Sequence, residues 1–176
     1  MSDLQSKLNQ IKSKESFFER IKRHIPGYDG YLNKDNSREL DTILRNQLAT
    51  GLEQNKAKIK NATLGLNRNG RLFEAGDIEK IDKKNENAIA KLRSAARGYS
   101  GAFDVVKIQE DKLNMLYEFD SALFGFIENL TASFSELENN CSGNLDIKES
   151  VNKVSTALDE LLKKFDEREA LLRSFS

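Results

Sequence analysis

Side chains with strongly reactive chemistry are scarce in this 176-residue sequence, which contains one histidine, His24, and one cysteine, Cys141. A thiolate next to an imidazole could act as a nucleophile–base pair, and several imidazoles could hold zinc. A zinc site built on several histidines is therefore excluded, and a Cys–His pair would have to join these two residues. His24 follows two basic residues at a predicted helix end, where cations interact favourably with the helix dipole. We expect structural or solvated roles for both residues and no enzymatic activity.

Two other familiar site patterns are missing from the sequence. It has no Glu-x-x-His pair, so a standard di-iron carboxylate bundle is excluded, and it has no Gly-x-x-x-x-Gly-Lys phosphate loop. The stretch GLNRNGR, residues 65–71, is rich in glycine but lacks a strand before it and a helix after it. We expect no metal and no cofactor.

A repeated motif is the best candidate for a functional surface. The stretch IPGYDGYL, residues 25–32, is echoed by RGYSGAFD, residues 97–104. Glycine allows positive φ and close backbone approach, and tyrosine combines an apolar ring with a polar tip. Two interpretations stay open: the aromatic rings close the end of a core, or they form a recognition surface. That surface would consist of Tyr28, Asp29, Tyr31, Tyr99, Phe103 and Asp104.

The elements that position this motif are predicted to be helices, because apolar residues recur at intervals of three and four along most of the chain. We expect a short N-terminal segment over 4–11, a first helix from a capping box at 16–19 to Pro26, and long helices over 36–65, 77–99, 104–138 and 146–175. The last helix has a seven-residue apolar repeat with one polar member, Arg168. The sequence thus predicts an all-α fold, an elongated antiparallel bundle of four long helices plus a short N-terminal helix with coiled-coil-like packing. It would form one domain, 1–176, in which residues 1–15 could stay flexible.

This arrangement leads to three predictions about which segments of the chain contact each other. Alternate loops of an up-and-down bundle share an end, so the two Gly-Tyr turns should meet, and the loops near residues 68 and 142 should meet at the other end. A basic excess in the second helix and an acidic excess in the fourth favour contact between them. Asn55 and Asn85, on apolar stripes of facing helices, are expected to pair and to fix the register.

Composition narrows the class of protein. The chain has 28 basic and 28 acidic residues, which argues against a general nucleic-acid binder. A single cysteine favours a reducing compartment, and we find neither a secretory signal nor an apolar run of the roughly 20 residues that span a membrane. We expect a cytoplasmic protein.

Two stretches, IPGYDGYLNKDNSRELDTILR and LRSAARGYSGAFDVVKI, resemble a group of uncharacterised bacterial all-helical proteins. In that group a Pro-Gly-Tyr-x-Gly-Tyr turn precedes a charged helix, and a Gly-Tyr-x-Gly-x-Phe-Asp turn precedes a long one. The resemblance covers roughly residues 17–130. It implies a bacterial cytosolic protein and no particular activity.

Together these observations predict a non-catalytic helical scaffold or protein-interaction module that binds a protein partner or itself. The alternative is a peripheral membrane protein whose basic amphipathic residues 1–25, with Phe17 and Phe18 on one side, lie on an anionic lipid surface. A small-ligand binder that uses the Gly-Tyr turns is the third and least favoured possibility.

Overall fold

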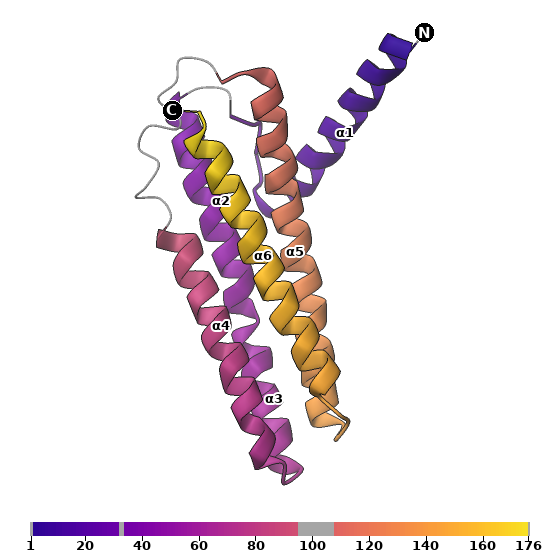
Figure 1. The fold of residues 1–176 in the computed structure, drawn as a ribbon, viewed down its shortest axis with the longest axis vertical. Coiled ribbons are helices and arrows are strands. Elements are labelled where there is room, and N and C mark those ends of the chain that lie inside the picture. Colours follow the sequence, from indigo (N-terminus) through magenta and orange to yellow (C-terminus); the bar gives the residue numbers. More distant parts are fainter. Residues whose placement is uncertain (1, 32–33, 95–107, 176) are drawn as a thin grey trace.

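The computed structural model describes residues 2–31, 34–94 and 108–175, and every regular element in these ranges is helical. The elements are α1 Ser2–His24, α2 Lys34–Gln54, α3 Lys56–Arg68, a short 3₁₀ turn η1 Leu72–Glu74, α4 Ala75–Ser94, α5 Glu110–Ser142 and α6 Lys148–Arg173 (Figure 1). The all-α prediction is confirmed. None of the described helices combines the length and the apolar character needed to cross a bilayer.

Long helices lie side by side, and cross-helix contacts fix their directions. α2 and α4 are antiparallel, because residue 85 bonds residue 52 and residue 92 bonds residue 45: the Asn85 amide donates to the Leu52 carbonyl, and Arg45 donates to the Leu92 carbonyl. Lys153 with Glu136 and Arg168 with Asp120 do the same for α5 and α6.

The contacts between these two pairs of helices run in the same direction along the chain. Lys84 bonds Asp159 and Lys91 bonds Asp166, which makes α4 and α6 parallel neighbours. A side chain at Gly51 would meet Ile127, and one further along at Gly65 would meet Cys141, so the α2–α3 rod runs parallel to α5. The expected contact between the basic second helix and the acidic fourth helix is therefore present, with a direction that a strictly antiparallel bundle would not have.

One apolar core extends through all six helices. It includes Ile21 of α1, Leu44 of α2, Ile59 of α3, Ile78 of α4 and Leu158 of α6, all buried. A fully buried side chain of this size stabilises the folded state by about 1.5–3 kcal/mol, so the core dominates the free energy of folding.

Helix α1 differs from its predicted outline. It is continuous from Ser2 to His24, whereas we expected a separate segment and a new start at Ser16. Ser16 lies exposed within the helix, and no glycine or proline interrupts the stripe that begins at Leu4. The helix ends where Pro26 and Gly27 follow, as predicted, and Gly27 has a positive φ of 81°.

Asn55 separates α2 from α3 in a region predicted as one rod. The backbone hydrogen bonding changes at the break: the Asn55 N–H donates to the carbonyl three residues before it, that of Leu52, at 3.1 Å. The Asn55 amide donates to the Gly51 carbonyl at 3.4 Å, and the Asn85 amide donates to the Leu52 carbonyl at 3.3 Å. The predicted Asn55–Asn85 pair is wrong: both side chains are buried, and their amides donate to backbone carbonyls around the break instead of to each other.

Other boundaries shift by a few residues. α2 begins at Lys34 and α4 at Ala75, each two residues before the predicted start, and α5 continues through Cys141, which we expected in a break. α6 begins close to prediction, and Asp146 supports its first turn by accepting the Lys148 N–H at 2.8 Å.

The loops near residues 68 and 142 meet at one end of the molecule, as predicted. The Asn69 amide donates to the Cys141 carbonyl at 2.9 Å, and Arg71 donates to the Leu145 carbonyl at 2.6 Å. The first Gly-Tyr turn packs near the beginning of α5, at the other end, where the Tyr31 and Tyr117 rings stack 5.8 Å apart. The second turn, 97–104, lies outside the described residues.

Candidate functional site

Four charged side chains occupy positions on the apolar stripes of three helices. Asp41 and Arg45 come from α2, Asp120 from α5 and Arg168 from α6, and all four are buried. Asp120 follows Leu116 by four residues on α5, which directs it inward with the stripe. These residues are joined to one another by hydrogen bonds and ion pairs.

Arg168 is the centre of this buried network. Its Nε donates to Asp120 Oδ1 at 2.6 Å, and its Nη1 lies 2.8 Å from Asp41 Oδ1. Its Nη2 donates to the Tyr31 hydroxyl at 3.1 Å, and that hydroxyl donates to Asp120 Oδ2 at 2.5 Å. Two arginines and two aspartates give this network equal numbers of basic and acidic groups.

Arg45 extends the network to α4. Its Nε donates to Asp41 Oδ2 at 3.0 Å, and its Nη1 approaches the carbonyls of Leu92 and Arg93 at 3.4 and 3.5 Å. These carbonyls belong to the last turn of α4, where the helix leaves acceptors unpaired and its dipole favours a cation. The network thereby joins α2, α4, α5 and α6 with the 25–31 turn.

The 25–31 turn positions Tyr31 in the network because its backbone packs closely against Tyr117 of α5. Gly30 has a φ of 93°, and an added Cβ would lie 2.6 Å from the Tyr117 hydroxyl, so both conformation and space require glycine. The Tyr31 N–H donates to that hydroxyl at 3.1 Å. Phe18 of α1 packs on the Tyr117 ring at 4.8 Å and on the Tyr28 ring at 5.7 Å. The second glycine of the Gly-Tyr-x-Gly motif thus serves to seat the aromatic residue that follows it.

Burial governs the protonation of this group. It raises the pKa of Asp120, against the opposing effects of Arg168 and of the Tyr31 hydrogen bond. It also raises the pKa of Tyr31, and nearby Asp120 adds to that rise, so the hydroxyl stays protonated and donates. Burial alone would lower the pKa of Arg168, but Asp120 and Asp41 outweigh it, and the guanidinium stays charged.

The structure changes the interpretation of the predicted recognition surface. Tyr28 and Tyr31 are buried, with 0% and 4% of their surface exposed, so they belong to the core and are not on a surface. Asp29 is exposed. The other predicted members, Tyr99, Phe103 and Asp104, lie outside the described residues. For the first turn, the interpretation that aromatic rings close the core is the one that describes the geometry.

Sequence reasoning recognised only part of the network. It noted Arg168 as the polar member of the repeat on the last helix, but it gave no role to Asp41, Arg45 or Asp120. The available signal was their spacing: each lies three or four residues from a leucine of the same stripe. Opposite charges at stripe positions of different helices predict mutual pairing in the interior.

His24 and Cys141 do not form a catalytic pair. The His24 ring stacks on Phe124 at 4.3 Å, and its Nε2 lies 3.2 Å from Glu128 Oε1. Cys141 is thirteen residues beyond Glu128 on the same helix, which corresponds to about 20 Å. Its thiol is buried, and burial raises its pKa. Over the described ranges, no three His, Cys, Asp or Glu side chains gather in a way that could hold a metal ion.

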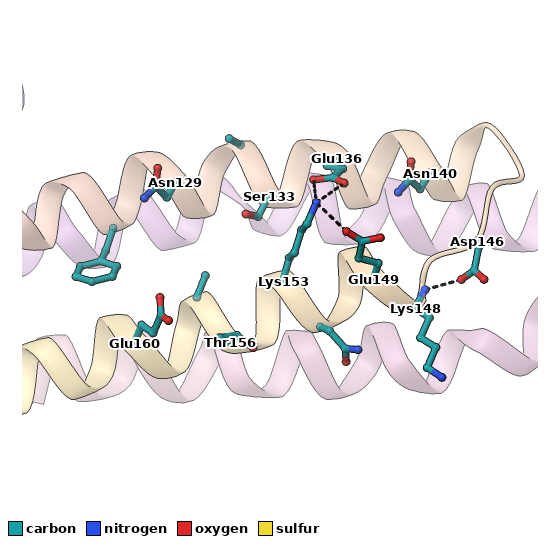
Figure 2. Close-up of a pocket in the computed structure, with 14 residues that line it drawn as sticks. Asn129, Ser133, Glu136, Asn140, Asp146, Lys148, Glu149, Lys153, Thr156 and Glu160 are labelled. Atoms are coloured by element: carbon teal, nitrogen blue, oxygen red, sulfur yellow. Dashed lines mark hydrogen bonds and ion pairs between the residues drawn. The ribbon is translucent and has the colours of Figure 1, made fainter.

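A groove of about 1050 Å³ runs along the surface between α5 and α6 (Figure 2). Figure 2 shows its polar lining, with Asn129, Ser133 and Glu136 on α5 and Thr156 and Glu160 on α6. Lys153 bridges the two helices by bonding Glu136 at 3.1 Å, and it also lies 3.4 Å from Glu149. The groove contains ordinary solvated ion pairs, which hold two helices together weakly.

Large apolar side chains are exposed at two places. Of the described residues, eight are exposed in this way. Four lie at the end where α3 passes into α4 and α5 into α6: Leu64, Leu72, Phe73 and Leu145. The other four lie along α1 and the beginning of α5: Leu4, Leu8, Ile11 and Met115.

Comparisons with known proteins give no relative: no protein-family model, no curated protein and no solved structure matches the chain.

Proposed function

We propose that this protein is a non-catalytic helical interaction module, in which a platform formed by α2 to α6 presents the outer half of α1 to a partner. We call residues 3–12 of α1 the arm. The buried network connects the helices of the platform, because Arg168 of α6 forms ion pairs with Asp120 of α5 and Asp41 of α2. Groups that are paired and enclosed in this way serve specificity of packing rather than turnover.

The exposed apolar stripe of the arm is the observation that carries the proposal. Leu4, Leu8 and Ile11 are 68%, 44% and 54% exposed, and they follow the three-and-four spacing of one helix face. Scattered exposed leucines are ordinary, but a line of them on a projecting helix marks a binding surface. The arm diverges from the other helices towards the N-terminus (Figure 1).

The test is affinity capture from the protein's own cell extract with two matched variants. Leu8→Asp places a carboxylate in the stripe, and Ser6→Asp places the same group on the opposite side of the arm. We expect the first to lose the proteins that the wild type retains and the second to retain them. Equal recovery by all three, or turnover of a small molecule by the purified chain, would contradict the proposal.

The second candidate is binding to an anionic membrane surface through residues 1–25. Lys7 and Lys12 flank the apolar stripe, as basic residues do in interfacial helices. Flotation with vesicles that contain an anionic lipid separates the candidates, because wild-type binding at low salt that is lost in Leu8→Asp would assign the arm to lipid.

A further inference from the structure

The loop that follows α3 contains a reactive dipeptide, Asn69 and Gly70. It is the one Asn-Gly step in the sequence. Because glycine has no side chain to shield its backbone nitrogen, that nitrogen can attack the amide carbon of the preceding asparagine and close a five-membered ring. Asn-Gly steps are therefore the places where asparagine loses its amide most readily without an enzyme.

The fold needs glycine at this position, because Gly70 completes the cap at the end of α3. The Gly70 N–H donates to the Asn67 carbonyl at 3.2 Å, and the Arg71 N–H donates to the Leu66 carbonyl at 2.9 Å. These two bonds define a Schellman cap, whose left-handed residue is Gly70 with a φ of 69°. The residue that ends the helix is thus also the one that makes Asn69 reactive.

The same cap holds the reactive atoms of Asn69 and Gly70 apart. Asn69 has a ψ of 7°, so the Gly70 nitrogen eclipses the Asn69 nitrogen, whereas ring closure requires it to eclipse the Asn69 Cβ. Two hydrogen bonds oppose the rotation that ring closure needs: the bond from Gly70 to Asn67, and the bond from the Asn69 amide to the Cys141 carbonyl at 2.9 Å. The reaction therefore requires the cap to open first, as amide exchange at a helix end does.

We propose that Asn69 is a modification site of this protein: it deamidates when the cap of α3 opens, and the product no longer holds the loop on the end of α5. The Gly70 nitrogen forms a bond to Asn69 Cγ, the bond from Cγ to Nδ2 breaks, and ammonia leaves with the proton of the Gly70 nitrogen. Water then opens the cyclic imide at either carbonyl, which gives aspartate or isoaspartate. This site lies at the opposite end of the molecule from the arm and does not depend on the proposed function (Figure 1).

Deamidation removes a contact between the two loops at this end. The Asn69 nitrogen that donates to the Cys141 carbonyl is replaced by a carboxylate oxygen, so two acceptors face each other and the bond is lost. The structure describes two side-chain hydrogen bonds between these loops, and the other one runs from Arg71 to the Leu145 carbonyl at 2.6 Å. Cys141 is buried where the loops join, so its thiol should become more accessible when one of these bonds is lost.

The first experiment compares deamidation in the folded and the unfolded chain. The protein is kept at mildly alkaline pH with and without urea, and peptide mapping by mass spectrometry follows aspartate and isoaspartate at each asparagine. We expect Asn69 to react first in urea and at least about tenfold more slowly in the folded protein, since the cap must open. Asn69→Gln is the control, because its longer side chain would have to close a six-membered ring; residue 69 should then stay intact.

The second experiment measures what the product does to the loop. Asn69→Asp carries the side chain of the deamidated protein, and Asn67→Asp places the same carboxylate at an exposed position of the same helix end. We expect Cys141 of Asn69→Asp to react with an alkylating reagent at least about tenfold faster than Cys141 of wild type, because a hydrogen bond that closes the loop is missing. Asn67→Asp should react like wild type.

Either experiment can overturn the inference. An Asn69 that does not react first in urea, or that reacts equally fast in the folded and the unfolded chain, contradicts a site gated by the cap. Equal reactivity of Cys141 in Asn69→Asp and Asn67→Asp contradicts the release of the loop. Neither result bears on the arm, whose binding is tested by Leu8→Asp.

Discussion

Replacing Arg168 with leucine tests whether the buried network holds the helices in register. The guanidinium is 0% exposed and lies within 2.8 Å of carboxylates from two other helices. Leucine would leave Asp120 buried with only the Tyr31 hydroxyl as a partner, and it would leave Asp41 with only Arg45. Removing one member of a buried ion pair costs about 3–5 kcal/mol, because the remaining charge stays desolvated.

Urea unfolding followed by circular dichroism measures this loss at constant m value. The matched control is Lys163→Leu, which also replaces a cation with leucine on the same helix, but at an exposed position. It should change the free energy of unfolding by about 0.5 kcal/mol or less. Adding Asp120→Leu to Arg168→Leu should restore part of the loss, since the stranded carboxylate is gone.

The pH dependence has a definite sign. The folded-state pKa of Asp120 lies above its ordinary value, so the folded chain holds that proton more tightly than the unfolded chain does. Ionising Asp120 therefore costs stability as pH rises through this window. Arg168 opposes that rise in pKa, so its removal is most damaging at neutral pH and less damaging once acid protonates Asp120. A loss below about 1 kcal/mol at neutral pH, or one that grows in acid, would refute the reasoning.

Three further substitutions or reactions test other parts of the fold. Gly65→Ala would put a Cβ 2.9 Å from backbone atoms of Cys141 and Ser142, and it should lower the free energy of unfolding in urea by about 1–3 kcal/mol. Its control is Gly76→Ala, where a Cβ would have nothing within 4 Å, and this change should stabilise the helix by up to about 1 kcal/mol. Equal effects of the two substitutions would contradict this packing. Tyr117→Phe leaves the buried Tyr31 N–H without its acceptor and should lower thermal stability by an amount equivalent to about 1–3 kcal/mol, and an unchanged melting temperature would show that the bond is not formed. The buried Cys141 thiol, with its raised pKa, should react with an alkylating reagent only as fast as the protein opens, so rapid modification of the native protein would contradict its placement.

Helical spacing in the sequence was sufficient to predict the class of fold and most helix positions. The stripe of α6 was regular enough to place Val154, Leu158 and Phe165 inside, and the loops around Asn69 and Cys141 were expected to meet. Both predictions depend on local periodicity, which tertiary contacts reinforce here.

The failures have physical causes that a single sequence does not reveal. Asn55 ends α2 because buried amides can satisfy the carbonyls of a broken turn, and that requires Asn85 from another helix. Ser16 resembled a helix start, but the apolar stripe continues past it. Tyr28 and Tyr31 could have faced water or the core, and the choice depends on Asp120 and Arg168, which lie far away in sequence.

The central claim is that the arm of α1 is the surface that a partner protein covers, and hydrogen exchange measures this directly. Amide exchange of residues 3–12 should be fast in the purified protein and markedly slower in its complex with a protein captured by the wild type, while the amides of α5 and α6 exchange equally slowly in both states. Arm amides that exchange at the same rate in both states would contradict the account.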